Sequence, residues 1–361
     1  MMYDYFVELF GNTVIAGIAS GILMSLLPLF IFILPYALLA VLAERKVSAH
    51  MQDRLGPMRI GWHGWNQTIA DILKLIQKED IVASDTDKPL FNFAPILVFA
   101  GSYAAFAAIP FSSYYIGSEV DLGIFYIIAV TGLVVAGILM AGWASNNKYS
   151  LLGSMRSVAQ IVSYEIPTML VVLSLVMVSE TMSLHKLSEM QTGYFWNWYI
   201  FGGPGFTLTK FLLIPSMLIG FIIIYISTLA EVNRVPFDIP EAESELVAGY
   251  HTEYSGMKFA MFFLAEYANM YAVSAIVAAL FFGGYQSPIG YLGNLLGVEW
   301  LIPLEQFFWF AAKGLFFVFV QMWLRWTLPR LRVDQLMAVS WKYLIPIAFI
   351  NLIIIGFITL I

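Results

Sequence analysis

Residues Leu122–Asn147 read LGIFYIIAVTGLVVAGILMAGWASNN and contain no Asp, Glu, Lys or Arg. A helix needs about 20 predominantly apolar residues to cross the hydrocarbon core of a bilayer. This stretch has the required length and carries no charge that would have to be buried in lipid. We therefore predict that it forms a transmembrane helix.

Runs of the same kind recur along the chain. Four further runs carry no charged residue: 13–43, 91–118, 211–230 and 343–361. Three others carry only one or two charged residues: 157–179, 259–304 and 306–324. The run 259–304 is too long for one span, and Gly283, Gly284 and Pro288 break it. With 60% hydrophobic and only 12% charged residues, the sequence predicts an all-α, polytopic membrane protein. We expect about eight transmembrane helices in a single integral membrane domain, residues 1–361.

The basic residues predict the orientation. Of the 18 Lys and Arg residues, all but Lys186, Lys210 and Lys313 fall in segments on one side of the predicted spans. The positive-inside rule places this side in the cytoplasm, so both termini are expected on the periplasmic side of a bacterial inner membrane. Residues 1–10 contain no basic residue, so we expect the first span to be a permanent helix and not a cleaved signal.

The first cytoplasmic loop, residues 43–90, contains a short amphipathic segment. From Trp65 onward, one helical face is apolar, with Trp65, Ile69, Ile72, Leu73 and Ile76. Such a helix of about four turns is too short and too polar to span the bilayer. It is either an interfacial anchor or the wall of a cavity, in which the arginines of the loop orient a polar head group.

The second cytoplasmic loop, residues 231–258, is acidic. It carries six acids against Arg234 and Lys258: Glu231, Asp238, Glu241, Glu243, Glu245 and Glu253. Pro236 and Pro240 forbid a continuous helix here. Glu241 and Glu245 are four residues apart and would share a helical face, where mutual repulsion raises the pKa of at least one of them. A solvated acidic loop is the alternative, but the Val, Ile, Leu and Pro content favours a packed segment. Arg234 and Asp238 are expected to form a charge pair that sets its geometry.

Three charged residues fall inside predicted spans: Glu165, Glu266 and Lys313. Such residues are costly in a membrane and are usually functional. Pro167 removes the helical partner of the Ser163 carbonyl, so we expect water or polar groups near Glu165. Glu165 is either a proton relay or a structural, hydrogen-bonded acid. Lys313 is expected to pair with an acid or to line a wet cavity.

Redox groups are not expected in this chain. It has no cysteine, which excludes cysteine-ligated clusters. Its four histidines lie outside the predicted spans, and it has no nucleotide or zinc motif, so we predict no metal site. We expect no nucleic-acid partner. No internal repeats are evident, which weakens the case for an inverted-repeat transporter.

Several motifs together resemble the quinone-site membrane subunit of respiratory complex I, the proton-pumping NADH:quinone oxidoreductase. They are Glu44-Arg45-Lys46, Gln52, Arg54, Gly56-Pro57, Gln67, Ala70-Asp71, Lys74-Leu75, Gln160, Ser163-Tyr164-Glu165, 230–249, 252–256, 262–267, Lys313, Arg325, Pro329-Arg330, Arg332, 334–337 and Trp341-Lys342. Val333 departs from the aromatic residue usual in this family. The loop 181–206 matches no pattern of the family.

The resemblance implies a function. It implies that quinone is the substrate, that FMN and iron–sulfur clusters belong to partner subunits, and that other membrane-arm and peripheral-arm subunits are partners. The implied quinone-binding residues are Arg45, Arg54, Asp71, Lys74, Phe262 and Phe263. The implied proton path consists of Glu165, Glu231, Glu241, Glu243, Glu245, Glu253 and Glu266.

Three other interpretations remain open on the residues alone. The first is the equivalent subunit of a membrane-bound hydrogenase or ferredoxin-linked complex. The second is a stand-alone secondary transporter, which would transport without partners. The third is a passive anchor for soluble partners, which the charged residues within the spans do not favour.

Overall fold

The computed structural model describes residue 11 and residues 29–115, 120–205, 208–240, 243–293, 297–298 and 300–360. The regular secondary structure in these ranges is helical. The chain divides into two units, Met1–Asp71 and Ile72–Ile361.

The first unit contains helix α3, Leu34–Met51, which follows a π-helical turn, Leu29–Ile33. The chain reverses beyond α3 through Asp53 (φ 54°) and Gly56 (φ 66°). The Lys46 ammonium donates to the Pro57 carbonyl at 2.7 Å and closes this turn. Much of the first predicted span, residues 13–43, lies outside the described residues.

Helix α4, Gln67–Gln77, begins in the first unit and ends in the second. It is the predicted amphipathic helix, with about three turns in place of the expected four. Its apolar residues Ile69, Ile72, Leu73 and Ile76 are exposed. The helix is therefore confirmed, while its location at a membrane surface stays a prediction.

The second unit contains the remaining predicted spans. Seven helical segments in the described part of the chain are long and apolar enough to cross a membrane: Lys88–Ala108, Gly123–Ala144, Lys148–Ser179, Thr209–Glu231, Gly256–Phe281, Leu301–Thr327 and Val333–Thr359. They comprise α5 (Lys88–Ala104), η3 (Ala105–Ala108), α6 (Gly123–Ala144), α7 (Lys148–Ser179), α9 (Leu208–Glu231), α11 (Gly256–Phe281), α13 (Leu301–Thr327), α14 (Val333–Ala338), η7 (Val339–Leu344) and α15 (Ile345–Thr359). The predicted all-α, polytopic membrane fold is confirmed.

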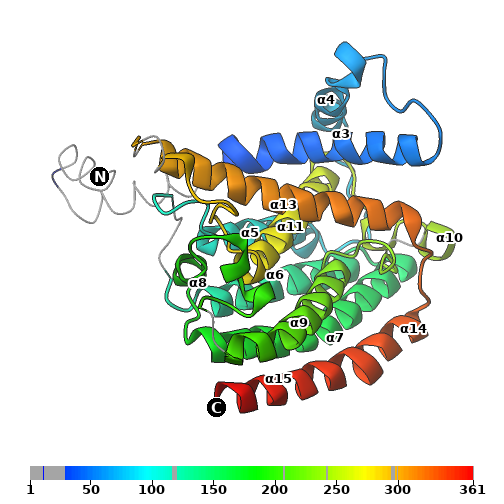
Figure 1. Ribbon diagram of the computed structural model, residues 1–361. Helices are drawn as coiled ribbons and strands as arrows, with labels where there is room; N and C mark the ends of the chain where they lie inside the picture. The colour runs from blue at the N-terminus through cyan, green and yellow to red at the C-terminus, as the bar shows by residue number, and fades with distance from the viewer. Residues whose placement is uncertain are drawn as a thin grey trace. The chain divides into compact units, whose positions relative to one another are not determined.

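These helices pack as one bundle. α7 lies beside α6, α9 and α15, while α11 lies beside α5 and α13 (Figure 1). One buried cluster joins α5, α6, α7 and α11 through small and aromatic side chains, among them Phe91, Ala141, Tyr254 and Phe262. We use "far end" for the end of the bundle opposite to the one where α6 ends and α7 begins. The far end carries α8 (Leu184–Met190) and the short turns η4 (Phe195–Asn197) and η5 (Tyr199–Phe201).

Pro167 lies inside α7 and affects its hydrogen bonding as expected. The Ser163 carbonyl, which lacks the N–H of residue 167, accepts a hydrogen bond from the Ser340 hydroxyl at 2.6 Å. One residue further on, the Tyr164 hydroxyl donates to the Leu336 carbonyl at 3.0 Å. The proline break thus ties α7 to α14 and η7.

The segment after α9 is irregular, as Pro236 and Pro240 predict. α9 ends at Glu231, and regular helix returns only in the single turn α10, Glu243–Leu246, and in η6, Gly249–His251. The segment is also packed, because Phe237, Ile239 and Leu246 are buried. The alternative of a solvated loop is therefore wrong at Phe237, Ile239 and Leu246.

Candidate functional site

A cavity of about 80 Å³ lies among α6, α7, α9 and α11. Most of its wall is Ile, Val, Ala, Leu and Met, but six polar side chains also line it: Thr131, Glu165, Thr168, Thr228, Glu231 and Asn269. A water molecule needs roughly 10–15 Å³ of such space and two or more polar partners. The cavity can therefore hold several waters next to two carboxylic acids.

The structure brings Glu165 and Glu231 to the same cavity from two helices. Glu165 lies two residues before Pro167 in α7, and Glu231 is the last residue of α9. Thr168 Oγ1 donates to Glu231 Oε1 at 2.9 Å and also lies 3.0 Å from the Tyr164 carbonyl oxygen. A hydroxyl has one proton to donate and also accepts, so Thr168 can serve either acceptor.

Glu266 of α11 is bound to the loop that follows α9. Arg234 Nε lies 3.1 Å from Glu266 Oε1, and the side chains are only 4% and 14% exposed. The Arg234 guanidinium also lies over the ring of Tyr267, 4.8 Å from its centroid. Breaking a buried ion pair by removing one partner typically costs about 3–5 kcal/mol. This pair therefore anchors the acidic loop to the bundle.

Asp238 has a partner from the other end of the chain. Arg330, just after α13, donates to its carboxylate at 3.0 Å. In addition, the Leu331 N–H donates to the Pro236 carbonyl at 3.1 Å. We expected Arg234 and Asp238 to pair with each other; the structure gives each of them a partner on a distant segment.

The remaining acids of the loop lie nearer to its surface. Glu245 accepts from Arg156 at 2.7 Å, and Glu253 accepts from the Asn147 amide at 2.7 Å. Glu241 lies outside the described residues, and for Glu243 the structure describes only the backbone. Of the acids in the predicted proton path, the structure describes the side chains of Glu165, Glu231, Glu245, Glu253 and Glu266.

A polar belt beside the cavity was not identified as a site from the sequence. The buried Gln160 donates to the Ala230 carbonyl at 2.7 Å and to Asn233 Oδ1 at 3.1 Å. Asn233 in turn donates to the Ser157 hydroxyl at 3.2 Å. Gln160 lies in a run that is otherwise mostly apolar, and a buried amide in a membrane span needs such partners. Its position in the sequence could have signalled this role.

The predicted quinone-binding residues are distributed over both units. In the first, Arg45 and Asp71 form an ion pair at 2.6 Å, and Arg54 donates to Gln52 at 2.7 Å. In the second, Lys74 is exposed on α4. Phe262 is buried against Tyr250, His251 and Tyr254, whereas Phe263 is 38% exposed and contacts Phe259 and Tyr267. The two phenylalanines therefore point to different sides of α11.

Among the described residues, the hydrogen-bond and cation–π partners of Lys313 of α13 include no acid. Lys313 also does not line the cavity that contains Glu165 and Glu231. Its ammonium donates to the carbonyls of Phe282, Gly284 and Gln286, at 2.6, 2.9 and 2.6 Å. It also lies over the Trp198 ring, 4.3 Å from the centroid. The expected acidic partner is replaced by backbone oxygens at the far end of the bundle.

Groups that could hold a metal ion were sought among the described residues. None of these residues form a set of three or more His, Asp or Glu side chains with the required geometry. The described site consists of carboxylic acids, their hydroxyl and amide partners and two arginine pairs. Taken with the seven spans, it defines a polytopic membrane protein with a polar, acid-lined interior.

Comparison with known proteins shows the family. A family model described as NADH dehydrogenase matches residues 24–356. Among curated proteins, the H subunit of the NADH-quinone oxidoreductase of Chlorobaculum tepidum is 51% identical over 92% of this chain and 90% of its own length. The H subunits of the NADH-quinone oxidoreductases of Cytophaga hutchinsonii and Geobacter sulfurreducens are 45% and 44% identical, over 90% and 97% of this chain and 95% and 97% of their own lengths.

The chain therefore belongs to the NADH dehydrogenase family. The relatives just described are, by their names, H subunits of an NADH-quinone oxidoreductase. The family expected from the sequence motifs is thereby confirmed.

Proposed function

We propose that this chain is the quinone-site membrane subunit of a proton-pumping NADH:quinone oxidoreductase. The names of its relatives and the acid-lined cavity between α6, α7, α9 and α11 support this proposal. In it, the chain forms part of the quinone tunnel and couples quinone reduction to proton translocation. FMN, iron–sulfur clusters and the electron donor belong to partner subunits of the membrane and peripheral arms.

The coupling step follows from the hydrogen bonds of Glu231. When this acid is ionised, Thr168 donates its proton to the carboxylate. When the acid is protonated, its own O–H can donate to the Thr168 oxygen, while Thr168 donates to the Tyr164 carbonyl. Both protonation states thus use the same positions of the heavy atoms. A group of this kind takes up and releases a proton without a rearrangement of the bundle.

Glu165 is the second carboxylic acid of the cavity, and waters between it and Glu231 would carry the proton. Ionising both acids puts two like charges into one poorly hydrated space, which is unfavourable. Their total proton content therefore responds to a charge that appears nearby. Reduction of quinone supplies such a negative charge and draws protons.

The acidic loop is the proposed connection between the quinone and this cavity. Two arginine pairs fix the first part of this loop, Arg234 with Glu266 and Asp238 with Arg330. Glu241, Glu243, Glu245 and Glu253 would carry protons along it. Arg45, Arg54, Asp71, Lys74, Phe262 and Phe263 are proposed to contact the quinone, the charged residues at its head group and the phenylalanines along its tail.

The experiment that tests the proposal replaces Thr168 by Val and by Ser in the assembled oxidoreductase. Val keeps the shape but removes the hydroxyl, so NADH:quinone activity should fall on the order of tenfold or more, while Ser should retain most of it. Assembly is checked by subunit content, and bound quinone is measured in the purified complex. Unchanged activity of the Val variant would remove Thr168 from the proton path. A quinone-free complex would favour the hydrogenase-type alternative.

A further inference from the structure

Three backbone carbonyls converge at the far end of α11. They belong to Phe282, Gly284 and Gln286, which follow the last helical residue, and we call them the carbonyl collar. Each carbonyl oxygen carries a partial negative charge, and that of Phe282, the C-cap residue, lies at the negative pole of the α11 dipole. The collar is thus a concentration of partial negative charge within otherwise apolar surroundings.

The Lys313 ammonium occupies this collar. All three of its N–H groups are used, since Nζ lies 2.6, 2.9 and 2.6 Å from the three oxygens. An ammonium has three donors and no acceptor, so the number of donors equals the number of acceptors. The Trp198 ring, with its centroid 4.3 Å from Nζ, adds a cation–π contact.

Two consecutive glycines bend the backbone into the collar. Gly283 and Gly284 have φ angles of 75° and 51°, in the left-handed region that L side chains rarely adopt. There is no room for a side chain at either position. A Cβ on Gly283 would lie 2.3 Å from the indole nitrogen of Trp198, and one on Gly284 would lie 2.2 Å from the Ser188 hydroxyl.

The loop 181–206, which the family motifs leave unexplained, supports the collar through Gln191. This fully buried amide accepts hydrogen bonds from the N–H groups of Gly283 and Tyr199, at 2.9 and 3.1 Å. It donates to the carbonyls of Leu187 and Ala279, at 3.1 and 3.0 Å. One side chain therefore satisfies the backbone on both sides of the turn and fixes its path.

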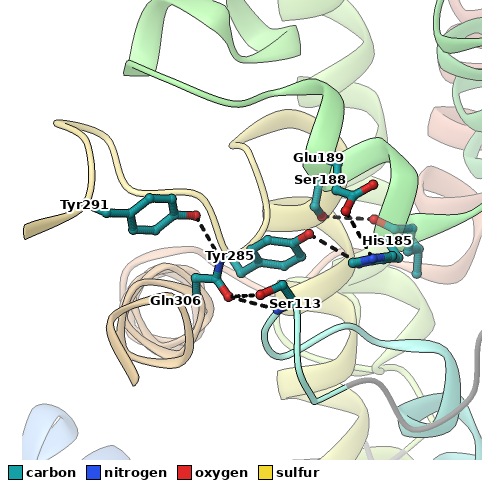
Figure 2. Close-up of polar contacts among 8 residues, drawn as sticks. Ser113, His185, Ser188, Glu189, Tyr285, Tyr291 and Gln306 are labelled. Carbon is teal, nitrogen blue, oxygen red and sulfur yellow. Dashed lines mark hydrogen bonds and ion pairs between the residues drawn. The ribbon is translucent and has the colours of Figure 1, made fainter. Parts of the chain in front are cut away.

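The segment that carries the collar is also held on both flanks (Figure 2). On one flank, the Tyr285 hydroxyl lies 3.2 Å from His185 Nδ1, and His185 Nε2 lies 3.3 Å from Glu189. On the other, Gln306 of α13 donates to Tyr291 at 3.3 Å and accepts from the Ser113 hydroxyl at 2.7 Å. These contacts hold the segment that carries the collar independently of Lys313.

We propose that the carbonyl collar is a binding site for a primary ammonium ion, and that Lys313 is its built-in occupant. Three carbonyl oxygens within hydrogen-bond distance of one nitrogen, together with an aromatic face, select a cation with three N–H donors. The consequence is that α13 is bound to the end of α11 at this point by charge-assisted hydrogen bonds. This property is independent of whether the acids of the cavity carry protons.

The test uses the full chain in detergent. Replacing Lys313 by Ala keeps Cβ and removes a fragment equivalent to propylammonium, leaving the carbonyls of the collar without a donor. The midpoint of thermal unfolding should fall by roughly 5 °C or more. Propylammonium chloride should restore at least half of the lost stability with saturable dependence on concentration. Tetramethylammonium, which has the same charge but no N–H donor, should not do so.

Lys313→Met is the matched control, because it fills the space without a charge and should gain nothing from propylammonium. A second route covers the case in which the Ala variant does not fold. The chain has no cysteine, so Lys313→Cys can be alkylated selectively with bromoethylamine, which restores an ammonium, or with iodoacetamide, which does not. Higher stability of the aminoethylated protein supports the proposal. Equal stability of both adducts, or equal rescue by propylammonium and tetramethylammonium, overturns it.

Discussion

Arg234 lies with its Nε 3.1 Å from Glu266 Oε1, which binds the acidic loop to the interior of α11. An arginine is always charged, and one that is almost fully buried needs a negative partner. The loop therefore cannot move away from the bundle without separating this pair. Because Arg330 also holds Asp238, the part of the loop that is free of these two ion pairs begins beyond Asp238.

The first prediction concerns this pair. Glu266→Gln leaves Arg234 buried without its carboxylate, and Arg234→Gln leaves Glu266 in the same state. Each single variant should lower the free energy of unfolding by about 3–5 kcal/mol. The double variant should lose less than the sum of the two single losses, which a double-mutant cycle of thermal unfolding measures. Simple additivity would show that the two side chains do not interact.

A second prediction concerns quinone binding. Asp71→Asn breaks the ion pair with Arg45, whose side chain is 44% exposed. Because exposed pairs contribute only about 0–1 kcal/mol, stability should hardly change. The KM for a long-tailed quinone should still rise roughly threefold or more, about 0.7 kcal/mol of binding. Asp85→Asn, an exposed acid of the same loop, serves as control. If both variants behave alike, Asp71 does not contact the substrate.

The third prediction is the orientation in the membrane. Reporter fusions in residues 181–206 should report the periplasm, and those in 231–258 the cytoplasm, because the Lys and Arg residues favour the latter side. Activity of an alkaline phosphatase fusion detects a periplasmic location of 181–206, and fluorescence of a cytoplasmic reporter detects a cytoplasmic location of 231–258. The reverse pattern would place the collar on the cytoplasmic side and contradict the predicted orientation.

The isolated chain is predicted to carry no redox group. This expectation follows from the absence of cysteine and of any histidine in a predicted span. An absorption spectrum of the purified full chain should show no haem, flavin or cluster bands, and proteoliposomes with this chain alone should not transport protons. A bound chromophore that resists washing would contradict the prediction.

Much of the fold follows from the sequence, because a charge-free run of about 20 residues has few alternatives in a membrane. The contact at the proline break was also predictable. Pro167 has no N–H to give, so the Ser163 carbonyl had to find another donor, and Ser340 provides it.

The partners of the charged residues were harder to predict. Arg234 and Asp238 are close in sequence, but their ion-pair partners Glu266 and Arg330 come from distant segments. Sequence spacing predicts side-chain pairs only in regular helices and strands, and this segment is irregular. The site of Lys313 depends on where a chain reversal directs its carbonyls, which no pattern of side chains encodes.

The cavity itself could be predicted only in part. Glu165 and Glu231 were expected on a proton path, whereas their common cavity with Thr168 and Asn269 depends on how α7, α9 and α11 rotate against one another. That rotation is set by close packing, such as Gly220 of α9 against Val171 of α7, where a Cβ on the glycine would lie 3.3 Å from Val171 Cγ1. Contacts of this kind become visible only in three dimensions.

The most direct test of the central claim measures the rate of NADH oxidation and the rate of proton translocation in proteoliposomes of the assembled complex. It compares Glu231→Gln with Glu180→Gln, an exposed acid just beyond the end of α7. We predict that Glu231→Gln reduces both quinone reduction and proton translocation on the order of tenfold or more, while Glu180→Gln matches the unmodified complex. Normal proton translocation at a normal rate in the Glu231→Gln complex would contradict the account.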